Sequence, residues 1–266
     1  MQDINQRNRN MIKLDRVYKK YTVTERKGQS LLKLFFSKRK DIQALHDLSL
    51  EIKEGQAFGL LGPNGAGKTT IIKILCGLTQ PTCGRVTIDE RPVDKSKKKI
   101  GVMLGSTMIY YRITGFDNLE YFARLYGVPE YKKRIEEMAD FLGLKDFIDD
   151  YPEVYSEGMK KKLALARALI HNPDILLLDE PTNGLDPRSS FQIRKRIAEL
   201  KAEDKTVLLC THDTQEAEFL CDRVGILNKG KLVTEGAPDS LKESVCQGKR
   251  LDNLNQVFMQ VTGELL

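Results

Sequence analysis

One stretch of sequence decides the fold of this 266-residue chain: Gly62-Pro63-Asn64-Gly65-Ala66-Gly67-Lys68-Thr69. It matches the pattern G-x-x-x-x-G-K-[ST], in which glycines let backbone N–H groups converge on phosphate oxygens without a side-chain clash. In such a loop the lysine reaches the β- and γ-phosphates of a nucleotide, and the hydroxyl ligates Mg²⁺. The sequence therefore predicts a phosphate cradle formed by this loop and Thr70, with Lys68 as a catalytic cation and Thr69 as a metal ligand.

The segments that flank the loop have the pattern that such a cradle needs. Gln56–Leu61 is a short apolar run that predicts a strand, and Thr69–Leu78 has apolar residues at helical spacing. The helix would direct the positive end of its dipole at the same anion. Three further apolar runs predict strands, namely Ile100–Leu104, Asp174–Leu178 and Thr206–Cys210. Buried strands alternating with helices indicate an α/β protein with a parallel sheet.

Two carboxylates, Asp179 and Glu180, follow the apolar run Ile175–Leu178 directly. In an open α/β sheet, ligands bind at the carboxyl ends of the strands. An acidic pair after a strand is often only a loop start or a helix cap. With a phosphate loop upstream, we expect Asp179 to hold Mg²⁺ and Glu180 to orient or deprotonate the attacking water.

Composition excludes several classes of protein. The chain is 41% hydrophobic and 30% charged, which excludes disorder, collagen and coiled coil for the chain as a whole. No apolar run approaches the roughly 18–20 residues that cross a bilayer, and the polar start at Met1–Asn10 predicts no secretory signal. The five cysteines form no Cys-x-x-Cys pair, which favours reduced thiols in the cytosol. The net charge of +6 allows a nucleic acid or a membrane surface as partner.

The segment Ser30–Lys40 combines apolar and basic residues, with the sequence SLLKLFFSKRK. A short helix there would carry an apolar surface beside a basic one, as segments at membrane interfaces do. A surface insertion packed onto its own domain explains the same composition. Other basic runs, such as Lys160-Lys161-Lys162, are typical of solvated faces.

The remaining pattern is mostly helical between Thr114 and Leu163, which predicts a helical lobe inserted into the α/β domain. Ser189–Lys201 predicts a further helix. Arg223–Leu227 and Lys231–Glu235 predict a hairpin, because a turn with glycine joins them. The chain after Gly236 is again mostly helical in pattern.

Three more motifs carry a family resemblance. Tyr155-Ser156-Glu157-Gly158-Met159 precedes a helical pattern, Pro181-Thr182-Asn183-Gly184-Leu185-Asp186 follows the carboxylates, and His212 follows the strand Thr206–Cys210. In this order and spacing, together with the phosphate loop, they resemble the ATP-binding subunit of ABC transporters over most of the chain. The resemblance implies a P-loop NTPase with a RecA-like core, N-terminal antiparallel strands and an inserted α-helical subdomain.

The resemblance also implies a mechanism. Two copies, identical or related, would pack head to tail and enclose two ATP molecules with Mg²⁺, each between the phosphate loop of one copy and the signature segment of the other. Ser156 and the backbone at Gly158 would contact the γ-phosphate across the dimer, and Asp186 would lie at the seam. His212 would hydrogen-bond the γ-phosphate. Tyr21 would stack on the adenine, with Tyr18 as the alternative.

The chain departs from the family pattern in two places. Tyr155, Glu157 and Met159 replace the usual residues of the Leu-Ser-Gly-Gly-Gln signature, whereas its phosphate-facing serine and second glycine are kept. The family normally has a glutamine after the strand Ile100–Leu104, but that position is Gly105, followed by Ser106. Our hypothesis is that Ser106, a backbone carbonyl or water substitutes for the glutamine.

The resemblance predicts four segments. Residues 1–105 would hold the N-terminal strands and the first part of the core, with a basic insertion at 22–40. The helical signature subdomain would span 106–160, the second part of the core 161–236, and a helical tail 237–266. The insertion and the tail are similar to those of the branch that exports drugs, sodium, lipids or peptides.

These features predict an ATPase subunit that powers export through a separate transmembrane permease, on the cytoplasmic face of the membrane. A non-transport ABC ATPase in DNA repair, translation or assembly is the alternative. A P-loop kinase or GTPase is a third class, but Glu180, the signature segment and His212 argue against it. Because the predicted partner is a membrane permease, we do not expect nucleic acid as a partner.

Overall fold

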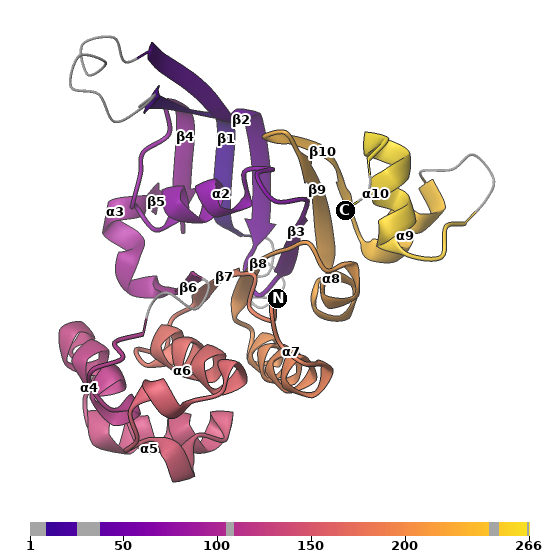
Figure 1. The fold of residues 1–266 in the computed structure, drawn as a ribbon. Coiled ribbons are helices and arrows are strands. Elements are labelled where there is room, and N and C mark those ends of the chain that lie inside the picture. The colour runs from indigo at the N-terminus through magenta and orange to yellow at the C-terminus, as the bar shows by residue number, and fades with distance from the viewer. Residues whose placement is uncertain (1–8, 26–37, 105–108, 245–249, 265) are drawn as a thin grey trace, which may run out of the picture.

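The computed structural model describes residues 9–25, 38–104, 109–244, 250–264 and 266, and its strands form two sheets (Figure 1). The first sheet has the order β2-β1-β4-β5 and consists of β1 (Asn10–Glu25), β2 (Lys38–Lys53), β4 (Cys83–Ile88) and β5 (Arg91–Pro92). The second has the order β10-β9-β3-β8-β7-β6 and consists of β3 (Ala57–Leu61), β6 (Ile100–Leu104), β7 (Ile175–Asp179), β8 (Thr206–Thr211), β9 (Arg223–Asn228) and β10 (Lys231–Gly236).

The second sheet is the core of the molecule, and its strands β3, β6, β7, β8 and β9 run parallel. Only β10 is antiparallel, because it forms the predicted hairpin with β9. Every residue of β3, β7 and β8 is buried, since both faces of the sheet are covered. This double burial explains why their sequences are apolar without alternation.

Helices cover both faces of the core sheet. On one face, α2 (Lys68–Leu75) packs between the two sheets, where Ile71, Ile72 and Leu75 join one apolar core with residues of β1, β2, β3 and β8. The other face packs against the remaining long helices in a second apolar core. The other described helices are α3 (Val93–Ser96), α4 (Gly115–Tyr126), α5 (Tyr131–Leu142), α6 (Glu157–Leu169), α7 (Pro187–Ala202), α8 (Thr214–Leu220), α9 (Pro238–Ser244) and α10 (Leu254–Thr262).

Helices α4, α5 and α6 form the predicted helical lobe, which lies below the core sheet in Figure 1. Thr114 begins α4 with a capping box, and Gly127 and Gly143 end α4 and α5 in left-handed conformations. The predicted limit between residues 160 and 161 falls inside α6. Helix α6 is continuous across this limit, from Glu157 to Leu169, and the division between lobe and core stays a prediction.

The predicted insertion at 22–40 is shorter than expected. Strands β1 and β2 stay paired as far as Glu25 and Lys38, so residues 22–25 and 38–40 belong to the first sheet. A helix is therefore wrong for Lys38–Lys40, whereas residues 26–37 lie outside the described residues. The extension of β1 carries Thr22, Val23 and Thr24, which are β-branched and favour strands.

The C-terminal tail is helical, as predicted. Helices α9 and α10 lie beside the β9–β10 hairpin (Figure 1), and α10 buries Leu254, Val257 and Phe258. In the described part of the chain, no helix combines the length and apolar character that crossing a bilayer requires.

Candidate active site

The phosphate loop, the two carboxylates and His212 come together at the carboxyl ends of the core strands. Gly62 follows β3, Glu180 follows β7, and His212 follows β8. The strands are in parallel register, with Leu61 opposite Thr211 and Asp179 opposite Cys210, so their carboxyl ends are adjacent. This edge is where ligands of open α/β sheets bind.

The phosphate loop needs its glycines for steric reasons. Gly65 and Gly67 have φ angles of +83° and +112°, which other residues rarely adopt. A Cβ atom on Gly67 would lie 2.8 Å from the carbonyl oxygen of Ala44, and one on Gly62 would lie 2.2 Å from that of Leu227. Helix α2 begins at Lys68, directly after this turn. The loop therefore directs the N-terminus of α2 at whatever occupies the cradle.

Lys68 lies across the loop with its side chain only 6% exposed. Its Nζ donates hydrogen bonds to the carbonyl oxygens of Gly62 and Pro63 and lies 3.1 Å from Glu180 Oε1. A strongly buried ammonium needs such partners, since burial without them is unfavourable. The contact joins the phosphate loop to the predicted catalytic carboxylate.

Thr69 and Asp179, the two residues predicted as metal ligands, are in direct contact. The Thr69 hydroxyl donates to Asp179 Oδ2 at 2.8 Å, whereas Asp179 Oδ1 is buried without a hydrogen-bond partner. Burial raises the pKa of the Asp179 carboxyl, and the hydrogen bond from Thr69 opposes this shift. A cation beside Oδ1 would satisfy it. Within the described residues there is no group of three or more His, Cys, Asp or Glu side chains that could hold a metal ion.

Glu180 and His212 form a direct pair. Glu180 Oε2 lies 2.8 Å from His212 Nδ1, whereas Oε1 lies within ion-pair distance of Lys68 Nζ, at 3.1 Å, and accepts no hydrogen bond. The Glu180 backbone is held as well, because its N–H donates to Cys210 and its carbonyl accepts from Lys161 Nζ at 2.9 Å.

Lys161 is a residue that the sequence analysis missed. It belongs to a basic run that predicts a solvated face, yet it is 5% exposed, so that interpretation is wrong for this residue. Burial lowers the pKa of its ammonium, against the pull of Glu180 and other carboxylates. The helical period of α6 was the available signal, because it turns Lys161 to the side of buried Gly158 and Leu165.

A cleft of about 340 Å³ lies over these groups. Its lining comes from three parts of the chain and comprises Ile42, Gln43, Ala44, Pro63, Asn64, Gly65, Gly67, Lys68, Thr69, Thr70, Asp179 and Glu180. No sequence pattern indicated that the three residues of β2 belong to the site, because they reach the cleft only through the strand pairing of the first sheet. A larger cavity, of about 530 Å³, lies beside α5, but its Arg134 already donates to the carbonyls of Leu169 and Ile170. The phosphate chemistry belongs to the smaller cleft.

Tyr21 lies near this cleft, whereas Tyr18 does not. Tyr21 pairs with Ile42 across β1 and β2, so both side chains are on the same face of the sheet. Tyr18 pairs with Cys83 of β4 and lines a different pocket. Of the two tyrosines, Tyr21 is the one paired with a residue that lines the cleft, and its contact with adenine stays a prediction.

We expect Tyr21→Ala to raise the KM for ATP about tenfold, because stacking of a base on an aromatic ring contributes about 1–3 kcal/mol. The matched control is Tyr18→Ala, which removes a tyrosine from the same strand without touching the cleft. Steady-state ATPase assays at varied ATP check both variants. A larger rise in KM for Tyr18→Ala would assign the adenine contact to Tyr18.

Ser156, Gly158 and Asp186 do not line the cleft. Ser156 Oγ begins α6 by accepting from the N–H of Met159, and Asp186 begins α7 in the same way. A Cβ atom on Gly158 would lie 2.9 Å from Ser189 Oγ, so this glycine allows α6 and α7 to approach closely. Gly105 and Ser106, the predicted replacement for the family glutamine, lie outside the described residues.

Comparison with known proteins decides the family. A family model described as ABC transporter matches residues 45–183, which include the phosphate loop and both carboxylates. The chain belongs to the ABC transporter family. It is 42% identical to the ABC transporter ATP-binding protein NatA of Bacillus subtilis (strain 168), over 85% of this chain and 93% of NatA. It is 37% identical to the linearmycin resistance ATP-binding protein LnrL of that organism, over 73% of this chain and 64% of LnrL.

Solved structures of ABC proteins have the same fold. The structure of an ATP-binding subunit of an ABC transporter matches with a TM-score of 0.78 and 25% identity, over 95% of this chain and 99% of that one. A dimeric post-hydrolysis state of the cassette MJ0796, bound to ADP and Pi, matches with a TM-score of 0.73 and 30% identity, over 85% and 98% of the two chains. This ABC protein is therefore an ATP-binding subunit with ATPase activity.

Proposed function

We propose that this ATPase powers export through a separate membrane subunit and works as a dimer of two such chains. The observation that carries ATP hydrolysis, the energy source of the proposal, is the joined set of Lys68, Glu180 and His212, of which Lys68 and Glu180 line the cleft. The names of similar proteins support export, since one is a linearmycin resistance protein and another a Nod factor export protein of Burkholderia thailandensis (strain ATCC 700388 / DSM 13276 / CCUG 48851 / CIP 106301 / E264), 40% identical over 78% of this chain and 70% of its own length.

The geometry suggests how hydrolysis begins. The backbone N–H groups of the phosphate loop and Lys68 bind the β- and γ-phosphates of ATP. When Lys68 turns to the phosphate, it leaves Glu180 Oε1, which then accepts a hydrogen bond from the attacking water. His212 keeps the other carboxylate oxygen in place during this exchange. Glu180 orients the water and takes up its proton.

Thr69 and Asp179 are the residues that would hold Mg²⁺. When bound, the ion neutralises charge that develops on the β- and γ-phosphate oxygens. Until then, the Thr69 hydroxyl and Asp179 Oδ2 keep each other oriented at 2.8 Å. The arrangement therefore presents two oxygen ligands before the nucleotide arrives.

A second copy would complete the site. Ser156, the backbone at Gly158 and the N-terminus of α6 are the groups that we assign to the γ-phosphate of the partner's nucleotide, because a helix N-terminus favours an anion. Asp186 would lie at the seam between the copies. The dimeric MJ0796 structures support this assembly. We place the dimer on the cytoplasmic face of a membrane, where basic residues are attracted to anionic lipid.

Purification of the tagged chain from detergent-solubilised membranes tests the transport function. We expect a protein with membrane-spanning helices to co-purify, and the complex in lipid vesicles to move a substrate when ATP is added. The Glu180→Gln complex is the control, because it should keep the membrane protein but lose ATP-driven movement. Full ATPase activity of the chain without any membrane protein, and no effect of the co-purified protein on turnover, would contradict the proposal.

A further inference from the structure

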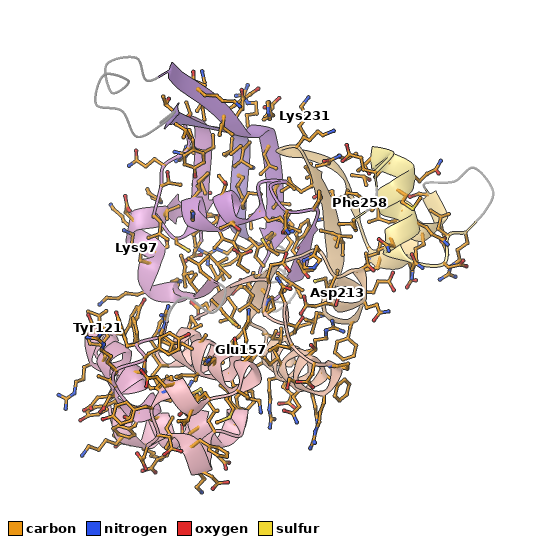
Figure 2. The ribbon with its side chains drawn as sticks, viewed as in Figure 1. Lys97, Tyr121, Glu157, Asp213, Lys231 and Phe258 are labelled. Atoms are coloured by element: carbon orange, nitrogen blue, oxygen red, sulfur yellow. The ribbon has the colours of Figure 1, made fainter. Side chains whose placement is uncertain are left out.

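A polar cluster with a buried centre lies next to the Glu180–His212 pair, between α7 and α8. Its members are Thr182, Arg194, Asp213 and Glu216, and Figure 2 labels Asp213 where α8 begins beside α7. Glu216 is 1% exposed and Thr182 is 7% exposed. A carboxylate buried this deeply contributes little to stability compared with an apolar residue of the same volume. Its presence calls for a functional explanation.

The contacts of the cluster run from the segment after β7 to the segment after β8. Thr182 Oγ1 donates to Glu216 Oε1 at 2.7 Å, and Arg194 Nε lies 3.8 Å from the same oxygen. Arg194 Nη2 donates to Asp213 Oδ2. Burial raises the pKa of the Glu216 carboxyl, whereas the hydroxyls of Thr182 and Thr211 and the charge of Arg194 oppose this shift.

These contacts close a ring that includes the catalytic pair. Thr182 is two residues after Glu180, and Asp213 directly follows His212. His212 Nδ1 in turn lies 2.8 Å from Glu180 Oε2. Glu216 belongs to the same segment as His212, since its N–H donates to Asp213 Oδ1 at the start of α8. The hydrogen bond from Thr182 to Glu216 therefore joins the two segments directly, and a relative shift of the segments strains this bond together with the Glu180–His212 contact.

We propose that Glu216 and Arg194 are positioning residues that hold the two segments at the spacing at which His212 contacts Glu180. Thr182 is the link on the side of Glu180, and Glu216 with Asp213 is the link on the side of His212, where Arg194 of α7 contacts both carboxylates. None of these four residues lines the nucleotide cleft, so they act on turnover and not on ATP binding. The inference rests on the proposed catalytic roles of Glu180 and His212.

The sharpest variant is Thr182→Val, which removes the hydroxyl and keeps the shape of the side chain. We expect kcat to fall about tenfold, because small displacements of catalytic groups slow reactions strongly. We expect the KM for ATP to stay within twofold, because the cleft is untouched. Thr182→Ser is the matched control, since it keeps the donor to Glu216 and should retain most of the wild-type kcat. Thermal unfolding of each variant verifies that the chain is folded.

Combination with His212→Ala separates positioning from a merely structural role. If Thr182 acts through the His212–Glu180 contact, Thr182→Val has little further effect once His212 is removed. Single-turnover ATPase assays of the full chain compare the four variants of this cycle. The same tenfold loss in both backgrounds would overturn the proposal while leaving the role of His212 intact. Normal turnover of His212→Ala alone would overturn that role and this inference together.

A second variant tests the contacts of Arg194 with Asp213 and Glu216. Arg194→Lys keeps a cation near Asp213, but an ammonium cannot reproduce the planar geometry with which a guanidinium reaches two carboxylates. We expect it to lower kcat severalfold without changing the KM for ATP, and to be silent in the His212→Ala background. An effect on KM alone would overturn the proposal. This variant also replaces Thr182→Val if that substitution prevents folding.

Discussion

Replacement of Glu180 by Gln is expected to lower the ATPase turnover number by a factor of about 10²–10³, because a general base contributes about 10²–10⁴-fold to catalysis. The amide has the same shape and can still contact Lys68 and His212. It cannot accept the proton of the attacking water. ATP should therefore bind normally, and the ATP-bound dimer should accumulate.

Two measurements check this expectation. Equilibrium ATP binding should be unchanged, and size-exclusion chromatography with ATP should show the dimer for Glu180→Gln. The control is Glu199→Gln, which changes a partly exposed glutamate paired with Arg196 on α7 and should turn over normally. A Glu180→Gln variant that hydrolyses ATP near the wild-type rate would assign the base to another residue.

Replacement of Lys68 by Ala should have the second large effect, on ATP binding as well as turnover. Hydrogen bonds to charged groups contribute about 1.5–3 kcal/mol, so ATP affinity should fall about 10- to 100-fold. Turnover should fall further, since the β- and γ-phosphates lose their cation. Loss of Lys68 also leaves Glu180 Oε1 without its partner at 3.1 Å, which weakens the hold on the catalytic carboxylate.

The matched control is Lys73→Ala, which removes a lysine from the exposed face of the same helix. Calorimetric or fluorescence titration with ATP should show wild-type affinity for this variant. Unchanged affinity and turnover for Lys68→Ala would disprove the role that we assign to the phosphate loop. Thermal unfolding without ATP shows whether any change in the Lys68 variant reflects loss of the fold.

Local patterns predicted the elements that surround the phosphate loop. The strand predicted at Ile100–Leu104 is β6 with the same limits. The phosphate loop could be recognised from its glycines and Lys68 alone. The patterns missed β4, because Cys83–Ile88 is short, is exposed over its first half, and becomes a strand only by pairing with β1. They missed α8 as well, a short helix that depends on its cap at Asp213.

The candidate site, too, could be predicted only in part from local sequence. Asp179 and Glu180 could be predicted because they follow an apolar strand within a recognisable motif. The partner of each catalytic group could not, since Thr69 and Asp179 are separated by 110 residues and Glu180 and His212 by 32. The positions of Tyr21 and Ile42 beside the cleft depended on the register of β1 and β2.

The sequence by itself determined the chemistry of this protein: a glycine-rich loop that ends in a lysine and a threonine, and carboxylates at the end of an apolar strand. These features depend on neighbouring residues and on backbone conformations that local sequence dictates. Only the tertiary structure decided which groups meet. The parallel register of β3, β7 and β8 brings their carboxyl ends together, and burial pairs Lys161 and Glu216 with partners that lie far away in the chain. Buried charges must find such partners, and the fold alone selects them.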